Sequence, residues 1–135
     1  MDAGAGSSLE FGRSDAKLED LQGILLNHLH VDHNTVLPRY IKSSYFTSKS
    51  ADIGLYGPAA NNLMLPTNDN LRRLLGDKGA FTYLKSHVDK RARAGYKIVV
   101  IDAPLLEGKT STYVLGYDIT AKATFVHHGP VAAVA

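Results

Sequence analysis

The chain has 135 residues, of which 44% are hydrophobic and 21% are charged, and its formal net charge is +2. This composition indicates a globular domain with a real core rather than a disordered chain, and the charge alone gives no argument for nucleic-acid binding. The absence of cysteine excludes disulfides and thiolate metal sites, and the apolar runs are too short to span a membrane. No signal-peptide pattern opens the sequence, so we expect a cytoplasmic protein without membrane association.

The first elements are short. Small residues at positions 2–8 indicate a turn, and residues 14–21 predict a short helix with one apolar edge formed by Leu18 and Leu21. The apolar run that follows predicts a buried strand over residues 23–27.

Four side chains of metal-ligand type follow this strand directly. They are His28, His30, Asp32 and His33. Side chains two positions apart on a strand share one face, so His28 and His30 can hold one metal at the end of the strand. Asp32 and His33 lie past the strand and can reach the same metal or a second one beside it. The alternative is a polar loop that is rich in histidine by chance.

The middle of the chain alternates between helix and strand. Pro38 predicts the first turn of a helix that continues through Tyr45, and residues 52–58 predict a strand closed by Gly-Pro. Thr67 or Asn68 is expected to cap a helix over residues 69–75, and residues 80–88 predict a second helical stretch. Two successive strand–helix units indicate a sheet covered by helices.

Two polar features of this region are expected to carry no chemistry. His87 stands apart from the other histidines, and we interpret it as a structural or solvated surface residue. A basic cluster is interpreted as a solvated face; its members are Lys85, Lys90, Arg91 and Arg93.

The last third of the chain is rich in β-formers. Three successive antiparallel strands are predicted over residues 97–103, 113–119 and 121–126. The last strand leads into a turn at residues 127–130, whose sequence is His-His-Gly-Pro. Five of the six histidines lie either here or in the motif after the first strand, which favours a shared chemical role over a polar turn with stray histidines.

Together, these motifs show a resemblance to a known family. The pattern H-x-H-x-D-H of residues 28–33 resembles the signature of the metallo-β-lactamase-fold hydrolases. Residues 37–46, L-P-R-Y-I-K-S-S-Y-F, and residues 128–131, H-G-P-V, are similar to segments of the arylsulfatase and ribonuclease Z-like branch. Residues 2–4, D-A-G, are similar to the D-x-G turn that precedes the histidine motif, so the resemblance covers nearly the whole chain.

The resemblance implies an α/β fold, specifically a partial αβ/βα metallo-β-lactamase sandwich. Residues 1–135 would form a single partial domain, about one half of the four-layer fold, without the opening β-hairpins. We expect the strand at residues 24–27 in the centre of its sheet, helices on one face, and an unusually apolar opposite face. The turn at residues 2–4 is expected to pack near the metal site.

The resemblance also implies roles for individual residues. The first metal would be held by three histidines, His28, His30 and His128, with His128 preferred to His127 because it precedes Gly129. Asp32 and His33 would hold a second metal, with Asp32 also orienting the attacking water. One or two zinc ions are expected, and iron or manganese would suit the same ligands.

The implied activity is a metal-dependent hydrolase in which metal-activated water attacks a phosphodiester, a sulfate ester or a related ester. A small-molecule ester or phosphodiester is the expected substrate, and RNA is a candidate. The family's bridging aspartate and last histidine have no counterpart here, so activity of this chain is left open. The alternatives are a catalytically incomplete metal-binding remnant, and a module that assembles with a partner chain, as a homo-oligomer or with a missing half.

Overall fold

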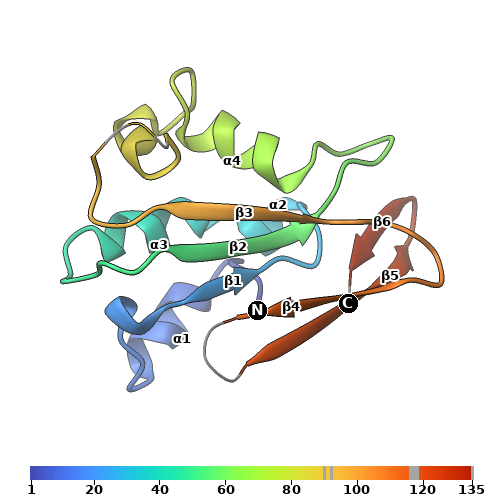
Figure 1. Cartoon of the computed structure of the whole chain (residues 1–135), viewed down its shortest axis with the longest axis horizontal. Helices are drawn as coiled ribbons and strands as arrows, with labels where there is room; N and C mark the ends of the chain where they lie inside the picture. Colours follow the sequence, from blue (N-terminus) through green and yellow to red (C-terminus); the bar gives the residue numbers. More distant parts are fainter. Residues whose placement is uncertain (90, 92, 116–118, 135) are drawn as a thin grey trace.

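In a computed structural model, described for residues 1–89, 91, 93–115 and 119–134, the chain forms two three-stranded sheets with helices around the first (Figure 1). The first sheet is parallel, with β2 in the middle; its strands are β1 (Gly23–Leu25), β2 (Ile53–Pro58) and β3 (Ile98–Ala103). The second is antiparallel; its strands are β4 (Thr110–Val114), β5 (Thr120–His128) and β6 (Val131–Val134).

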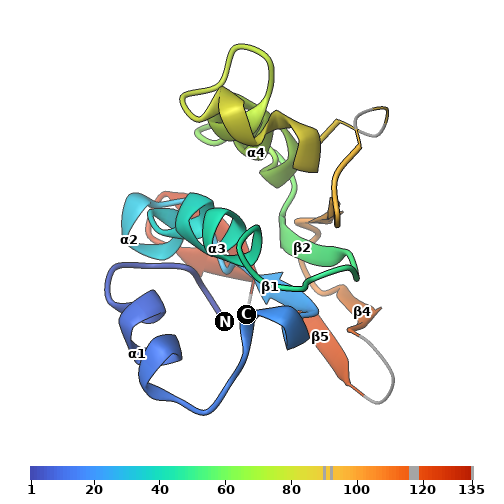
Figure 2. The same cartoon turned by 90° about the vertical axis from the view of Figure 1, so that its left-hand side faces the viewer.

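The helices lie mainly against one face of the first sheet. They are α1 (Ser7–Arg13), α2 (Val31–Asn34), α3 (Leu37–Ser44), α4 (Thr67–Leu75) and the 3₁₀ helices η1 (Leu18–Asp20) and η2 (Thr82–His87). Figure 2 shows α1 and α3 on one side of β1 and β2, and β4 on the other side. Among the described residues, no helix is both long and apolar enough to cross a bilayer.

The hydrophobic core lies between the first sheet and the helices. Helix α3 begins with Pro38 in its first turn, and its buried residues recur at the spacing of one helical face. They pack against strand residues that alternate along β2 and pair across to β1 and β3, because alternate side chains share a face. The main core residues are Ile24, Leu37, Tyr40, Ile41, Ile53, Leu55, Leu71, Leu75 and Ile98.

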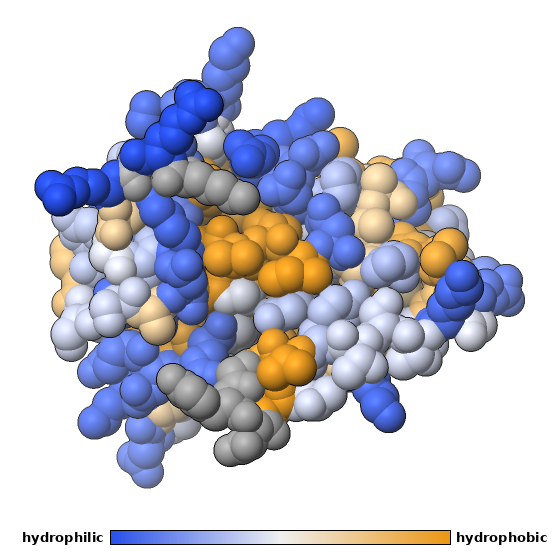
Figure 3. Space-filling view, viewed as in Figure 1, coloured by the Kyte–Doolittle hydropathy of each residue, from blue (hydrophilic) through white to orange (hydrophobic). Residues whose placement is uncertain are grey.

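The opposite face of the first sheet is only partly covered by the second sheet. Tyr56 of β2 packs against Tyr113 of β4, with ring centroids 5.4 Å apart, and its hydroxyl donates to the carbonyl of Val114 at 3.3 Å. Val99 of β3 lies on this same face and is 48% exposed. Figure 3 shows apolar side chains gathered at the middle of this face and hydrophilic ones around them, so the predicted apolar surface is a local patch rather than the whole face.

The prediction of a central strand over residues 23–27 is wrong in two respects. The strand is only three residues long, and β2 rather than β1 is the middle strand of the described sheet. The outer edge of β1 instead receives a backbone hydrogen bond from the N–H of Asp2 to the carbonyl of Leu25, at 2.6 Å. The chain therefore leaves the sheet before it reaches His28.

The short helices also differ from expectation. Helix α1 was not predicted; it overlaps the predicted turn at residues 2–8 only at its first two residues, and the ring of Phe11 meets Tyr40 edge-on at 5.7 Å. The helix predicted over residues 14–21 is reduced to η1, and the carbonyl of Glu19 accepts a hydrogen bond from the buried Lys49 amine at 3.1 Å. In residues 80–88 the chain forms a 3₁₀ helix, which places Leu84 and His87 together on the buried side.

The predicted cap of α4 is wrong as well. Thr67 is the first residue of the helix, and its hydroxyl donates to the carbonyl of Pro58 at 3.0 Å. The capping role falls to Asp102 of β3, whose carboxylate accepts the backbone N–H of Asn68 at 3.0 Å. The first N–H groups of a helix have no acceptor within the helix, and here a carboxylate from a distant strand accepts one of them in place of a local capping side chain.

The strands of the last third are arranged differently from the prediction. Strand β3 pairs in parallel with β2 rather than antiparallel with the strand that follows it. Strand β4 occupies Thr110–Val114, and part of the predicted strand at 113–119, residues 116–118, lies outside the described residues. Strand β5 runs through both His127 and His128, so the turn is confined to Gly129 and Pro130.

Candidate functional site

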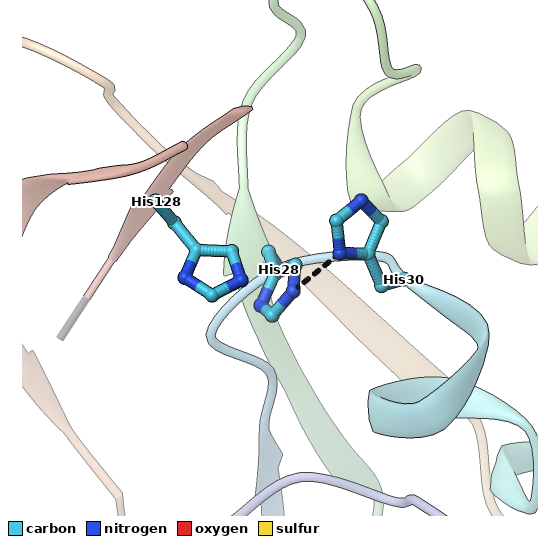
Figure 4. Close-up of side chains that lie close together, drawn as sticks. All are labelled: His28, His30 and His128. Carbon is cyan, nitrogen blue, oxygen red and sulfur yellow. Dashed lines mark hydrogen bonds between the residues drawn. The ribbon is translucent and has the colours of Figure 1, made fainter. Parts of the chain in front are cut away.

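Three histidines meet at the carboxyl end of β1, two from the loop that follows this strand and one from β5. His28 and His30 lie in the loop between β1 and α2, and His28 Nε2 is 2.9 Å from His30 Nδ1 (Figure 4). His128 ends β5, and the centroid of its ring lies 4.6 Å from that of His28 and 5.9 Å from that of His30. One nitrogen from each of the three side chains lies within 4.8 Å of the other two.

A backbone contact between the sheets brings these loops together. The N–H of Val134 in β6 donates to the carbonyl of Asn27 at 2.9 Å. Gly129 adopts a left-handed conformation, with φ of 58°, so β6 folds back along β5 immediately after His128. His128 is thereby held beside the loop that carries His28.

The turn at residues 2–4 packs against the histidine motif, as expected. The N–H of Ala3 donates to the carbonyl of His33 at 2.7 Å, and Ala3 is fully buried. A Cβ atom at Gly4 would lie 1.9 Å from the carbonyl oxygen of Asp32. Only glycine fits this approach, which gives a steric reason for the glycine of the D-x-G pattern.

Asp2 links the turn to two neighbours of His28. One carboxylate oxygen accepts the backbone N–H of Asn27 at 2.8 Å, and the other lies 2.9 Å from His33 Nδ1. Because an ionised carboxylate only accepts hydrogen bonds, the Nδ1 of His33 carries a proton in this pairing, and in neutral His33 Nε2 has the free lone pair. Asp2 also has a left-handed φ of 56°, which is uncommon for a residue with a side chain.

Asp32 and His33 lie in the short helix α2 rather than in a loop. The ring centroid of His33 is 4.1 Å from that of His28, and its Nε2 is 3.5 Å from an oxygen of Asp32. The Asp32 side chain is 73% exposed and faces solvent beside this ring. The two residues therefore lie next to the three converging histidines without joining them.

The surroundings of His28 favour its neutral form. Its side chain is almost completely buried, and burial is the main cause that lowers its pKa below the usual 6.5. Electrostatic repulsion from His33, His30 and His128 lowers it further, while Asp32 acts in the opposite direction. A neutral imidazole is the form that binds a metal ion.

The remaining two histidines do not join this group. His127 points away from His128 along β5, and its ring meets Phe125 with centroids 4.8 Å apart. His87 is buried rather than at the surface, which corrects its predicted location, and its Nδ1 lies 3.1 Å from the carbonyl of Tyr96. In the basic cluster, Lys85 pairs with Asp77 at 3.0 Å, and Lys90 lies outside the described residues.

Sequence reasoning did not find the pairing of Asp2 with His33. The D-x-G turn was expected near the site, but nothing in its sequence indicates which side chain its carboxylate meets, 31 positions away. The positive φ of Asp2 and the bond to Asn27 appear only once the turn has packed onto the loop after β1.

Comparisons with known proteins give similarity in sequence and in structure to ribonuclease Z and tRNase Z proteins. No protein-family model matches it. Ribonuclease Z of Synechococcus sp. (strain WH7803) is 39% identical over 58 residues, which cover 43% of this chain and 18% of that protein. Ribonuclease Z of Listeria monocytogenes serotype 4a (strain HCC23) is 28% identical over 120 residues, which cover 77% of this chain and 39% of that protein.

Among solved structures, the crystal structure of human tRNase Z, short form, matches 98% of this chain with a TM-score of 0.65 and 20% sequence identity. The match covers 50% of that structure, and the curated relatives named above are covered over less than half of their length. The fold is therefore shared over almost the whole of this chain. The chain is therefore similar in sequence to ribonuclease Z proteins over part of its length, and it has the metallo-β-lactamase fold of human tRNase Z, short form, of which it spans about half.

Proposed function

We propose that this chain carries the histidine half of a metal-dependent phosphodiester hydrolase that acts on RNA. The observation that carries the proposal is the convergence of His28, His30 and His128, with candidate ligand atoms within 4.8 Å of one another. These residues come from two segments almost a hundred positions apart, and each segment is fixed by its own sheet.

The donor set fits a zinc ion. Three imidazoles that leave a further position open to water are a ligand set of catalytic rather than structural zinc sites, and iron or manganese can use the same donors. A divalent ion held there would lower the pKa of a coordinated water and polarise a phosphate oxygen. The lowered pKa of His28 keeps one donor in its binding form near neutral pH.

Asp32 and His33 supply the next polar groups beside this position. We assign Asp32 the role of accepting a hydrogen bond from the attacking water and orienting it, because its carboxylate is exposed at the rim of the cluster. His33, with Nδ1 turned to Asp2, offers Nε2 on the side of Asp32. Together they form the proposed position for a second ion.

The choice of RNA as substrate rests on the relatives, which are named ribonuclease Z or tRNase Z. A phosphodiester is preferred to a sulfate ester for the same reason. Assembly with a partner chain or a second copy remains part of the proposal, because the chain spans about half of the solved structure it matches and Val99 is exposed on the face that the second sheet covers only in part.

A direct test measures cleavage of bis(p-nitrophenyl) phosphate and of an end-labelled RNA, each with added zinc or manganese. The wild-type chain should hydrolyse the small diester, EDTA should stop the reaction, and His30→Ala should abolish it. His127→Ala is the matched control, because it removes a histidine from β5 that faces away from the cluster. Hydrolysis that survives in His30→Ala would contradict the assignment of the site.

A second candidate is metal binding without turnover. It is favoured by one observation: within the described residues, Asp32 and His33 are the two side chains at the proposed second position, and they do not complete a group of three ligands. Metal analysis separates the two candidates. Two ions per chain together with hydrolysis support the enzyme, and one ion without hydrolysis supports the binding module.

A further inference from the structure

An exposed group of aromatic rings lies at the end of the first sheet remote from His28, His30 and His128 and next to His87, whose ring lies 6.2 Å from that of Tyr45. Tyr45 and Phe46 follow the last turn of α3, and Tyr83 belongs to η2; their exposed fractions are 60%, 72% and 63%. In Figure 1 the end of α3 lies on the opposite side of the molecule from β5 and β6. These three rings and Lys42 are called the aromatic–lysine surface below.

The ammonium group of Lys42 contacts all three aromatic rings of the surface. Lys42 Nζ lies 4.9 Å from the ring centroid of Tyr45, 4.4 Å from that of Phe46 and 5.4 Å from that of Tyr83. All three distances are within the range of cation–π attraction. Tyr45 and Phe46 also meet edge-on, with centroids 5.3 Å apart and planes at 88°. The rings are therefore held in place before any partner arrives, with much of their area still open to solvent.

The two segments that form the surface carry basic side chains and no acidic ones. Residues 37–50 and 78–87 contain no aspartate or glutamate. Lys49 is buried, and Lys85 pairs with Asp77, so neither adds a full positive charge to the surface. Of the remaining cations, Lys42 contacts the three rings and Arg39 lies three residues before it on α3, whereas Lys78 lies beside Asp69, Arg72 and Arg73. An excess of positive charge beside open aromatic faces suits a chain of phosphates that carries planar bases.

We propose that the aromatic–lysine surface binds single-stranded RNA, with bases stacked on Phe46 and Tyr83 and phosphates near Lys42 and Arg39 of α3. The preference for RNA rests on the proposed function, whereas the preference for a single strand rests on this surface, because paired bases keep their faces inside the duplex. An RNA chain held here would be anchored away from the histidines, so the surface is a docking site and takes no part in the chemistry.

The test uses fluorescence anisotropy with the full chain in EDTA, so that binding through a metal ion and hydrolysis are both absent. The probes are a labelled oligouridine of about 12 nucleotides, within the site sizes of single-strand-binding folds, and an abasic phosphodiester chain of equal length. The variants are Phe46→Ala with Tyr83→Ala, and Lys42→Gln. The matched controls are Leu63→Ala, an exposed apolar residue elsewhere, and Lys17→Gln, an exposed cation elsewhere.

Wild type should bind oligouridine about tenfold or more tightly than the abasic chain, and the double aromatic variant should lose about tenfold or more in affinity. Lys42→Gln should weaken binding and reduce its salt dependence, while both controls bind as wild type does. Equal affinity for the two probes, or wild-type affinity in the aromatic variant, would overturn the proposal. No binding of oligouridine by wild type would also overturn it, yet would leave diester hydrolysis as an independent test of the proposed function.

Discussion

His28 and His87 are the two buried histidines of the described chain, with 3% and 2% of their surface exposed, and they lie at opposite ends of the first sheet. His28 follows β1 and is surrounded by the rings of His30, His33 and His128. His87 packs on Tyr96, which precedes β3, with ring centroids 4.4 Å apart. The Nδ1 of His87 lies 3.1 Å from the backbone carbonyl oxygen of Tyr96.

The pKa of each histidine is lowered, and burial is the largest cause for both. The secondary causes differ. Other imidazoles lower the pKa of His28 further, whereas the hydrogen bond to Tyr96 partly raises that of His87. Burial and a lowered pKa therefore do not distinguish a metal ligand from a core residue. The distinction comes from the ring nitrogens, which in His28 face other ligand-type side chains.

The largest effect expected is loss of metal binding. His128→Ala should lower zinc affinity by about 100-fold or more, beyond the 10–100-fold loss typical of outer-shell partners, because it removes one of three converging donors. His127→Ala should leave the affinity unchanged, since its ring faces Phe125. Competition with a chromophoric chelator measures both. Equal losses in the two variants would mean that the assignment of His128 is wrong.

His87→Ala should affect the fold and leave metal binding intact. Removing a buried ring and its hydrogen bond to Tyr96 should cost about 2 to 3 kcal/mol in the free energy of unfolding, measured by urea denaturation. His127→Ala, exposed on β5, should cost less than about 0.5 kcal/mol. Loss of zinc binding by a folded His87→Ala variant would contradict the conclusion that His87 stabilises the fold without taking part in metal binding.

Asp2→Ala should have a smaller effect on the metal. Asp2 holds the backbone of Asn27 and the ring of His33, so its loss should loosen the loop around His28 and lower zinc affinity by about tenfold. Nitrogen NMR of the imidazoles should show protonation of His33 at Nδ1 in wild type and a mixture of tautomers in the variant. Asp15→Ala, exposed near η1, is the control, and an unchanged His33 spectrum in Asp2→Ala would remove the positioning role.

The smallest effect concerns pH. Because the pKa of His87 is lowered in the folded chain, the unfolded chain takes up a proton first as the pH falls below 6.5. The stability that His87 contributes is therefore complete above pH 6.5 and is lost as the pH falls through the folded pKa. His87→Phe should reduce, without abolishing, the pH dependence of unfolding in metal-free protein between about pH 7.5 and about pH 5, because the lowered pKa of His28 acts in the same direction. An unchanged slope would show that His87 is not the group responsible.

The order of the larger elements could be predicted from local patterns. The periodic apolar residues of α3 and the β-formers of β2 and β3 indicate their own structure, because burial follows the period of each element. The pairing of β3 could not be predicted in this way. The segment is β-rich in either arrangement, and its parallel partner β2 lies 40 residues earlier in the chain.

The convergence of three histidines was predictable from the sequence, but the contacts that hold their loops in place were not. His28, His30 and His128 stand in motifs that can be recognised, and the structure brings them together. Two contacts that hold the loops in place, from Asp2 to His33 and from Val134 to Asn27, join segments 31 and more than 100 positions apart. Such contacts depend on tertiary packing, as does the cap that Asp102 provides to α4.

Zinc K-edge X-ray absorption on protein loaded with one equivalent of zinc tests the central claim most directly. We predict three imidazole nitrogens at about 2.0–2.1 Å with an oxygen completing the shell, and loss of one imidazole in His30→Ala and in His128→Ala. The spectrum of His127→Ala should match that of wild type. A shell made mainly of oxygen, or a spectrum that neither His30→Ala nor His128→Ala changes, would contradict the assignment of these histidines as the metal site.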